Sequence, residues 1–408
     1  MSSCKKNQNM PLLMMAYFIS SAGNWIFKFA TPLYIFTATS SAQLMALAYA
    51  AQFLPVVLFS LFVGYVSERF DNKKLLLLMD FIGFVLCLAL FSLWHDEMPS
   101  ELYILYSFLI ASITTSYHSF FHGAIPRAFT SKQIHSVSGG IAFIDSFFPI
   151  LGPMLGAVVA SVISYKSALL LTGFGFLVSW FITLFIVFHD RELEKTGSLY
   201  KTIKNGFKII IESRFLSFAI LRFFMAGIGL NCFVSLFMFL LKTEYFLSDV
   251  DVGIVYAISF IGLLVGKRIT SFIYNYRFDI ELLLTCTGLV TALCIYLLSI
   301  RIGFVAVVVA WSVITMMSTI NLIILYTERQ KEVDKSNITN VVSISTMLIL
   351  LSFPIGSFSA SELIEFLNVF DVINISALYL LILSGIFLLS WCYSWVKRLS
   401  RQDTSEES

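Results

Sequence analysis

A few charged side chains lie within long apolar segments, where a charge costs about 2.5–3.5 kcal/mol. Lys28 and Arg222 each lie well inside such a segment, and Asp145 is the only acid at central depth. Two fixed cations favour an anionic ligand, because the planar guanidinium group matches a pair of carboxylate or catecholate oxygens and lysine adds a point charge. Asp145 is a candidate proton carrier, since intramembrane carboxyl groups commonly serve as proton relays.

Two histidines and three further polar side chains extend this set. His118 and His122 are four residues apart, so they share one helix face and could bind a metal ion. The sequence offers no third ligand at their depth, and we expect no metal site. Lys28 or Arg222 could instead form a structural ion pair with Asp145, and His118 then becomes the alternative proton carrier. The other polar candidates are Asn24, Tyr117 and Asn321.

The composition shows which kind of protein must position these side chains. The 408 residues are 58% hydrophobic and 13% charged, and 41 of them are phenylalanine. Soluble domains are about 45–50% apolar and about 25% charged. The composition therefore excludes a soluble enzyme, a nucleic-acid-binding protein and a secreted disulfide scaffold, and it indicates a multi-pass membrane protein.

Twelve segments are long and apolar enough to cross a bilayer as helices. We therefore predict an all-α integral membrane protein with twelve transmembrane helices in two pseudo-symmetric six-helix bundles. The segments are 11–37, 42–66, 74–95, 101–124, 136–163, 166–189, 213–241, 250–272, 279–300, 302–327, 338–366 and 373–396. This pattern predicts an N-terminal bundle at 1–189, a cytoplasmic linker at 190–212, a C-terminal bundle at 213–397 and a polar tail at 398–408.

The basic residues orient these segments. With both termini in the cytoplasm, 22 of the 27 lysines and arginines lie on the inner side, 3 lie on the outer side and 2 lie within segments. Cytoplasmic loops of membrane proteins carry such an excess of basic residues. The distribution therefore supports twelve spans with both ends inside.

Four stretches carry a resemblance to a known family. Residues 23–34, 50–55, 64–74 and 152–156 resemble the major facilitator superfamily, and within it the efflux branch that contains the enterobactin exporter and the macrolide efflux proteins. Residues 64–74 match the family's signature loop between the second and third helices, although Glu68 replaces the usual aspartate and Asp71 lies where many members have glycine. The resemblance covers essentially the whole chain and implies a transporter of the bacterial inner membrane.

The signature loop has a physical role of its own. Gly64 allows two helices to approach closely, Glu68 can accept hydrogen bonds from a helix start, and Arg69 can bind a carbonyl or carboxylate. Together with Asp71 and Lys73, we expect these residues to latch one bundle to the other. The alternative is that they are positive-inside anchors on a short loop.

A second motif lies in the fifth segment. Gly152, Pro153 and Gly156 resemble the Gly-Pro motif of antiporters, which is associated with export. Asp145, Gly152 and Gly156 fall on one helix face. We expect this face to contact a helix of the other half.

Gly262 and Gly266 form a superficial phosphate-binding pattern together with Lys267. The pattern is one residue short and lies inside an apolar segment without a preceding strand. We therefore interpret the two glycines as a helix-packing pair.

The resemblance also implies which candidates share a space. In this superfamily the first, fourth, seventh and tenth helices line a central cavity. That arrangement implies a substrate site formed by Asn24, Lys28, Tyr117, His118, Arg222 and Asn321, with Asp145 in proton coupling.

The sequence therefore predicts a monomeric secondary transporter, not an enzyme, that exports a small organic anion in exchange for protons. A siderophore with carboxylate or catecholate groups is the expected substrate, and no cofactor is expected. Multidrug or macrolide efflux is the alternative, because neutral macrolides require no charge in the cavity. An integral membrane enzyme is a third hypothesis, for which only His189 and Asp190 form a local pair of reactive groups.

Overall fold

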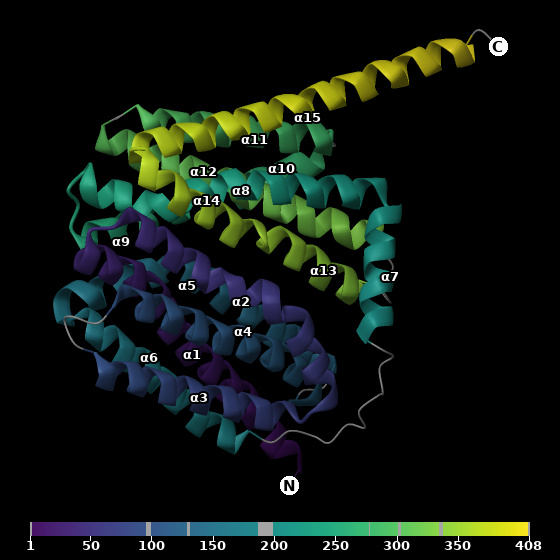
Figure 1. The fold of residues 1–408 in the computed structure, drawn as a ribbon. Coiled ribbons are helices and arrows are strands. Elements are labelled where there is room, and N and C mark those ends of the chain that lie inside the picture. Colours follow the sequence, from purple (N-terminus) through teal and green to yellow (C-terminus); the bar gives the residue numbers. More distant parts are fainter. Residues whose placement is uncertain are drawn as a thin grey trace.

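The computed structural model describes residues 2–94, 99–128, 131–186, 199–276, 278–300, 303–333 and 338–406, in which every regular element is a helix. The first half consists of α1 (Ser2–Thr39), α2 (Ala42–Arg69), α3 (Asn72–Leu93), α4 (Ser100–Ala128), α5 (Ser131–Val158), the π-helical η1 (Val159–Ile163) and α6 (Tyr165–Phe185). After α7 (Leu199–Glu212), the second half consists of α8 (Arg214–Thr243), α9 (Asp249–Ile258), α10 (Phe260–Asn275), α11 (Ile280–Ser299), α12 (Phe304–Glu332), α13 (Ile338–Leu350), α14 (Ser352–Phe366) and α15 (Val369–Glu406). Figure 1 shows the halves one above the other, with α15 extending past the second half.

Short polar residues explain where several of these helices begin. A serine or aspartate side chain that accepts a hydrogen bond from the first turn satisfies a backbone N–H that has no partner within the helix. At Ser248 the arrangement is a complete capping box with Asp251. The other side-chain caps in the described residues include Ser41, Asp71, Ser164, Ser213, Asp279 and Asn368.

Ten helical segments in the described residues are long and apolar enough to cross a membrane. They include α1, α3, α6, α8, α11 and α12, and the consecutive pair α9–α10. The ten do not include α4 or α5, although both are helices where the sequence predicts them. The all-helical membrane fold is thus confirmed at the level of ten candidate spans. The linker prediction at 190–212 falls partly on residues 190–198, which lie outside the described residues.

Two predicted segments are each divided into two helices. The segment 250–272 changes from α9 to α10 at Ser259, whose hydroxyl donates to the carbonyl of Tyr256 at 2.6 Å and so competes for a backbone acceptor. The segment 338–366 changes from α13 to α14 at Leu351. Pro354 follows three residues later, and its ring excludes a regular bond to the carbonyl of Leu350.

Helix packing in the first half is repeated in the second. In the first half α1 packs on α5 and α6, α2 packs on α4, and α3 packs on α4 and α6. In the second half α8 packs on α14 and α15, α10 packs on α12, and α11 packs on α12 and α15. Each of these contacts has its counterpart six segments later in the chain. The fold is therefore an internal repeat of two helical halves.

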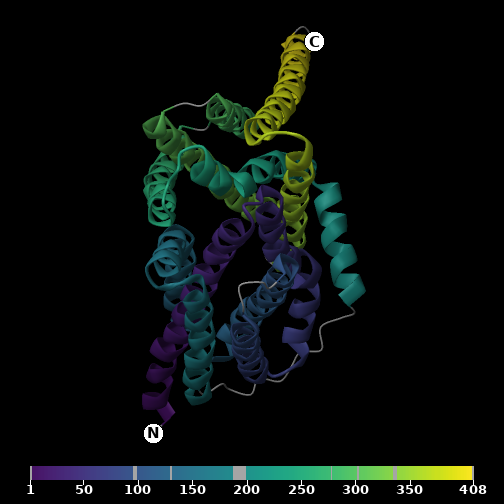
Figure 2. The ribbon, with the colours of Figure 1, turned by 60° about the vertical axis from the view of Figure 1, so that its left-hand side comes forward.

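The two halves join through a shared apolar core near one end of the helices. α2 lies along α14 and α13, and α5 lies along α9. The core joins Phe29, Leu33, Met45 and Ala157 of the first half to a larger set of residues in the second half. The ribbons of the two halves are close where α5 meets α9, and those of α2 and α13 diverge toward α7 (Figures 1 and 2).

Candidate functional site

Lys28 lies on α1 with its ammonium group among aromatic rings. Its Nζ atom lies 5.1 Å from the ring centre of Trp25 and 5.8 Å from that of Phe53 on α2. Gln52 donates to the Lys28 carbonyl at 3.1 Å and so joins α2 to α1 at this level. No described residue forms a hydrogen bond or an ion pair with the ammonium group. Phe53 packs against Phe353 of the second half, with ring centres 4.7 Å apart and the rings tilted by 41°, so Lys28 lies next to the boundary between the halves.

Asn24, one turn before Lys28, is buried with 3% of its surface exposed. Its Oδ1 atom is buried and has no hydrogen-bond partner in the described part of the chain. A buried acceptor without a donor costs about 1–3 kcal/mol. Asn24 therefore offers an acceptor close to the lysine.

Asp145 forms the end of a hydrogen-bonded chain of three side chains. The hydroxyl of Tyr17 donates to the carboxylate of Asp145 at 2.6 Å. The hydroxyl oxygen of Tyr17 also lies 2.9 Å from Nδ1 of His118. Tyr17 is completely buried, whereas the side chain of Asp145 is exposed. Tyr17, His118 and Asp145 come from α1, α4 and α5, respectively, so three helices of the first half meet here.

This arrangement bears on the structural ion pair that the sequence offered for Asp145. The carboxylate is bound by Tyr17 and forms no ion pair with Lys28 or Arg222. The charge of Lys28 acts on His118, and that of Asp145 acts on His122. The structural ion pair considered from the sequence is therefore absent among the described residues, and the polar groups form a cluster around Tyr17 instead.

Tyr17 is the residue of this cluster that sequence reasoning did not include among the candidates. A signal was present, because Tyr17, Asn24 and Lys28 follow one another at seven and four residues and so share one face of α1. No group of three histidine, cysteine, aspartate or glutamate side chains that could bind a metal ion occurs in the described ranges.

Tyr117 points toward the interior of the first half. Its hydroxyl lies 3.1 Å from the hydroxyl of Ser179 on α6, and Ser179 donates to Asp80 of α3 at 2.7 Å. Asp80 is fully buried, and its other carboxyl oxygen has no partner in the described residues. The structure therefore places the Tyr117 hydroxyl in a hydrogen-bonded chain with Ser179 and Asp80.

Arg222 and Asn321 point toward α11 within the second half. Arg222 is 5% exposed, donates to Thr285 at 2.9 Å and to the carbonyl of Leu284, and lies 5.0 Å from the ring centre of Phe387. The amide oxygen of Asn321 accepts from Thr287 at 2.6 Å. The structure does not bring Arg222 and Lys28 together, because α11 supplies the hydrogen-bond acceptors for the guanidinium group.

The signature loop is described only in part. Asp71 accepts from the backbone N–H of Lys73 at 2.9 Å and so caps α3. The Lys73 ammonium donates to the carbonyls of Leu184 and Ile186 at the end of α6, at 2.9 and 2.7 Å. These contacts hold α3 to α6 within the first half. The Arg69 side chain is exposed, whereas the surroundings of Gly64 and the side chain of Glu68 lie outside the described set.

The Gly-Pro motif packs differently from the prediction. A Cβ atom on Gly152 would lie 2.6 Å from Trp25, and one on Gly156 would lie 3.0 Å from Phe29, so both glycines face α1 of the same half. Gly152 therefore makes room for the ring that lies beside Lys28. The contact with the other half is made at Pro153 and its neighbours, which approach Gly253 of α9. The predicted cross-half contact of Gly152 and Gly156 is wrong, because the close approach there is to α1.

Polar contacts also cross between the halves. Tyr165 at the start of α6 donates to Asp249 at the start of α9 at 2.6 Å, and Lys242 forms an ion pair with the same carboxylate. Gln43 of α2 donates to Glu365 of α14. With the ring contacts Phe29–Tyr256 and Phe36–Phe239, these bonds close one end of the molecule.

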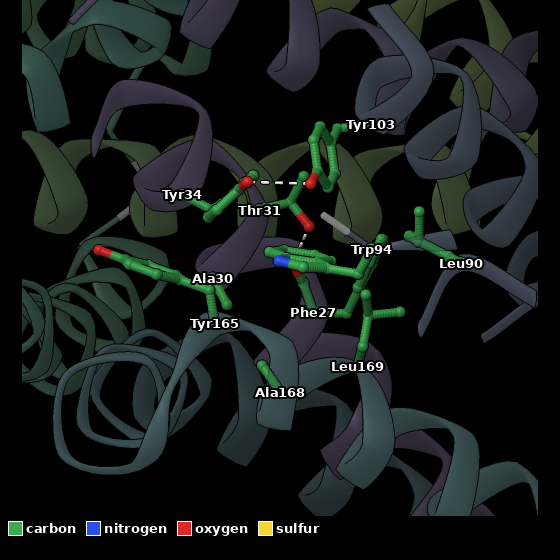
Figure 3. A pocket seen from close by; sticks show the side chains of 10 residues that line it. All are labelled: Phe27, Ala30, Thr31, Tyr34, Leu90, Trp94, Tyr103, Tyr165, Ala168 and Leu169. Atoms are coloured by element: carbon green, nitrogen blue, oxygen red, sulfur yellow. Dashed lines mark hydrogen bonds between the residues drawn. The ribbon is translucent and has the colours of Figure 1, made fainter. Parts of the chain in front are cut away.

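A small aromatic pocket lies at the same end of the first half (Figure 3). Tyr34 and Tyr103 share a hydrogen bond of 2.9 Å, and Trp94 lies 4.4 Å from Tyr34 between ring centres. The pocket contains none of the predicted site residues. Its tyrosines, Tyr34, Tyr103 and Tyr165, are therefore distinct from the Tyr17 cluster.

The described residues define an integral membrane protein of transporter type. They form ten apolar segments and two repeated helical halves, and polar side chains lie within the apolar helices. The sequence model of the Major Facilitator Superfamily matches residues 13–357. The chain belongs to the Major Facilitator Superfamily, as its signature stretches indicate.

Curated relatives of the chain are transporters of the same superfamily. It is 26% identical over 65% of its length to the uncharacterized MFS-type transporter YkuC of Bacillus subtilis (strain 168), covering 66% of that protein. It is 25% identical over 62% of its length to macrolide efflux protein A of Streptococcus pyogenes, covering 63% of it. It is 21% identical over 49% of its length to the staphyloferrin A transporter of Staphylococcus aureus (strain NCTC 8325 / PS 47), covering 53% of it. The matches thus span about half to two thirds of the length of these relatives.

Solved structures share the fold. A point mutant of the nucleoside transporter NupG has a TM-score of 0.74 at 14% identity, covering 93% of this chain and 99% of that one. A bacterial homolog of the human lysosomal transporter Spinster has a TM-score of 0.73 at 12% identity, covering 94% and 96%. At these identities the comparison concerns the fold alone.

Proposed function

We propose that this protein is a secondary active transporter that exports a small organic anion, with a carboxylate-bearing siderophore as the expected substrate, in exchange for protons. It acts in a bacterial inner membrane as a twelve-span monomer with both termini in the cytoplasm. The basic residues of the sequence support this orientation.

The observation that carries the proposal is the environment of Lys28. Its ammonium group lies between two aromatic rings at the boundary of the halves, and no described acid neutralises it. A charge kept among apolar groups without a partner is costly and marks a functional site. A carboxylate substrate supplies the missing partner, and the rings of Trp25 and Phe53 contact its apolar part. Asn24 accepts a hydrogen bond from a hydroxyl or N–H group of the substrate.

Asp145 supports proton coupling. It is an exposed carboxylate in the same half as Lys28, and it is free of any ion pair among the described residues. Its charge is therefore not held by a salt bridge within the described part of the chain. Proton binding at Asp145 alternates with anion binding at Lys28 in the proposed cycle.

The contacts between the halves favour a state that is open to the cytoplasm. The Tyr165–Asp249 and Gln43–Glu365 bonds join the ends of the helices away from the N-terminus and α7. In the proposed orientation these ends face outward. Rocking of one half against the other exposes the site alternately to each side.

Multidrug efflux is the second candidate, and one observation favours it. Because Arg222 is bound by α11, Lys28 remains the single described cation between aromatic side chains at the boundary of the halves. Such a site could also accept a neutral amphipathic molecule. The similarity to macrolide efflux protein A agrees with this alternative.

Transport by the purified full chain in proteoliposomes separates the two candidates. An imposed pH gradient drives uptake into vesicles that contain the protein, with staphyloferrin A and erythromycin as probes. Gradient-dependent transport of staphyloferrin A that is inhibited by citrate supports the anion proposal. Transport of erythromycin alone replaces it with drug efflux, and transport of neither probe under any gradient contradicts both candidates.

A further inference from the structure

The hydrogen bonds around Tyr17 have a fixed direction. A tyrosine hydroxyl carries one proton, and the Tyr17 proton is donated to the carboxylate of Asp145. Toward His118 the same oxygen can therefore only accept, so Nδ1 of His118 carries a proton at this 2.9 Å contact. The geometry thus sets the tautomer of His118 when Asp145 is ionised: Nδ1 is protonated and Nε2 is free.

We propose that Tyr17 is a proton relay that links the charge of Asp145 to the tautomer of His118. This inference rests on the proposed function, because it names the path by which the coupling proton reaches Asp145. It adds Tyr17 and His118 to the coupling apparatus, where the sequence predicts only Asp145 or His118 as alternatives.

The transfer balances in protons. A proton binds Nε2 of His118, the proton on Nδ1 moves to the oxygen of Tyr17, and the original Tyr17 proton moves to Asp145. Asp145 becomes a neutral carboxyl group, Tyr17 remains a neutral phenol, and His118 becomes the neutral tautomer protonated on Nε2. In the product the carboxyl group donates to Tyr17, and Tyr17 donates to Nδ1. Every hydrogen bond in the chain has reversed its direction, and no ion other than the transferred proton is required.

Packing holds the three groups in line. Tyr17 is completely buried, its ring stacks on Phe121 at 4.1 Å between centres, and it meets the ring of His118 edge-on at 5.2 Å. A buried ring held on two sides keeps its hydroxyl at one position. The relay is therefore formed before a proton arrives.

Other titratable groups surround α5, and each has a defined place. From α4, His122 interacts electrostatically with Asp145, while the Tyr117 hydroxyl is occupied by Ser179. α9 meets α5 near Gly253, beyond Gly152, so its acids and Tyr256 lie several turns away. η1 carries no titratable side chain. From α1, the charge of Lys28 acts electrostatically on His118, as does His122 from α4.

The relay makes the charge of the cluster depend on Asp145 alone. With Asp145 ionised, the cluster of Lys28, His118, Tyr17 and Asp145 is neutral overall. When the relay delivers a proton, Asp145 loses its charge and the cluster carries the single positive charge of Lys28.

The test measures the tautomer directly in the purified full chain in lipid nanodiscs, without any substrate. Histidine ring nitrogen shifts distinguish the two neutral tautomers, and His118→Gln assigns the signal among the 5 histidines of the sequence. The carboxyl carbon signal of Asp145 is assigned with Asp145→Asn. We expect His118 to change from the Nδ1-protonated to the Nε2-protonated tautomer at the same pH midpoint at which Asp145 becomes protonated.

Tyr17→Phe removes only the hydroxyl and keeps the ring stack, so the two midpoints should separate. Tyr34→Phe, on the same helix but in the aromatic pocket, is the matched control and should leave them coincident. Asp145→Asn provides a second test, because the His118 tautomer step should then disappear. An Nε2-protonated His118 at every pH, or coincident midpoints in Tyr17→Phe, overturns the relay.

The relay and the proposed function fail in different ways. If the His118 and Asp145 midpoints coincide in the wild-type protein but it transports no probe, the relay is retained and the transport proposal is rejected. Gradient-driven transport that is unchanged in Tyr17→Phe rejects the relay and leaves the transporter intact.

Discussion

At Lys28 the energetics point to a ligand that is present for part of the cycle. A cation over an aromatic ring gains about 0.5–2 kcal/mol, whereas an unpaired charge in an apolar surrounding costs more. The two ring contacts therefore compensate only part of the cost. Arg222 shows the contrasting solution, since α11 provides two hydrogen-bond acceptors and Phe387 a ring. The lysine is the residue that an incoming anion can stabilise.

Replacing Lys28 by methionine tests this role. Methionine keeps the length and the contacts to Trp25 and Phe53 but removes the charge. Because a hydrogen bond to a charged group contributes about 1.5–3 kcal/mol, the affinity for staphyloferrin A should fall about 10- to 100-fold. Binding to the purified protein, followed by calorimetry, measures the effect. Lys166→Met, another lysine over a ring, is the control and should bind as the wild type does; equal affinities in both variants exclude the anion site.

Asp145→Asn should separate transport from the pH gradient. The asparagine keeps an acceptor for Tyr17 but cannot take up a proton, so counterflow of labelled probe should continue while gradient-driven accumulation is lost. Asp279→Asn is the control, because asparagine also caps a helix and Asp279 is an exposed cap of α11. Gradient-driven accumulation by Asp145→Asn at the wild-type level assigns the coupling to another residue.

The sequence predicts how deep a residue lies along its helix better than it predicts which neighbouring helix its side chain faces. Lys28, Asp145 and Arg222 were all identified from their depth in apolar segments, and each lies in a helix as expected. Arg222 nevertheless points to α11, because Thr285 and the carbonyl of Leu284 lie on that side. The positions of such partners depend on the packing of segments that are distant in sequence. Spacing within one helix cannot supply them.

At the scale of helices, glycine determines how closely elements pack. A Cβ atom on Gly262 or Gly266 would collide with the backbone of Ser312 or Met316 in α12, so the predicted packing pair is confirmed. Gly152 and Gly156 were also recognised as contact residues, but their partner is α1 of the same half. Small residues thus reveal that a close contact exists, while the identity of the partner helix depends on the tertiary fold.

Gly253 on α9 provides a test at this scale. A Cβ atom there would lie 2.9 Å from Ala157 and 3.0 Å from Met154, so Gly253→Leu forces α9 away from α5 in this state. Overpacking costs about 1–3 kcal/mol. The equilibrium constant between the closed and open states of this end should shift toward the open state by the factor to which this free energy corresponds. Solvent accessibility of an Ala157→Cys label measures the change. Gly385→Leu is the control, since no atom lies within 4 Å of its Cβ position; equal accessibility in the two variants contradicts the assigned contact.

At the scale of the whole molecule, the repeat explains how the halves move. The same helix pairs pack in both halves, and the contacts between halves, α2 with α14 and α5 with α9, are also related by the repeat. Exchange between two such equivalent interfaces requires only a rotation of one half against the other. The sequence indicates the repeat only through two sets of six apolar segments, because packing partners and not residue identities are what the halves share.

The bonds of Tyr165 and Asp249 hold the closed end and give the last test. Tyr165 donates to a carboxylate that Lys242 also binds, so Asp249 joins two helices of the second half to the start of α6. Tyr165→Phe removes one hydrogen bond to a charged group, worth about 1.5–3 kcal/mol. The equilibrium should therefore shift about 10- to 100-fold toward the state in which this end is open. Spin labels at Ala38 and Phe246, both exposed, in a protein with its 6 cysteines replaced, report the separation of the ends.

The expected result is a second, longer label separation that gains population in Tyr165→Phe and also in Asp249→Asn. Tyr393→Phe, an exposed tyrosine of α15, is the control and should keep the wild-type distribution. The shift should add to that of Gly253→Leu, because both changes weaken the same interface without sharing a contact. If the long separation instead loses population in Tyr165→Phe, the bond stabilises the open state, and its assignment as a contact that holds this end closed is wrong.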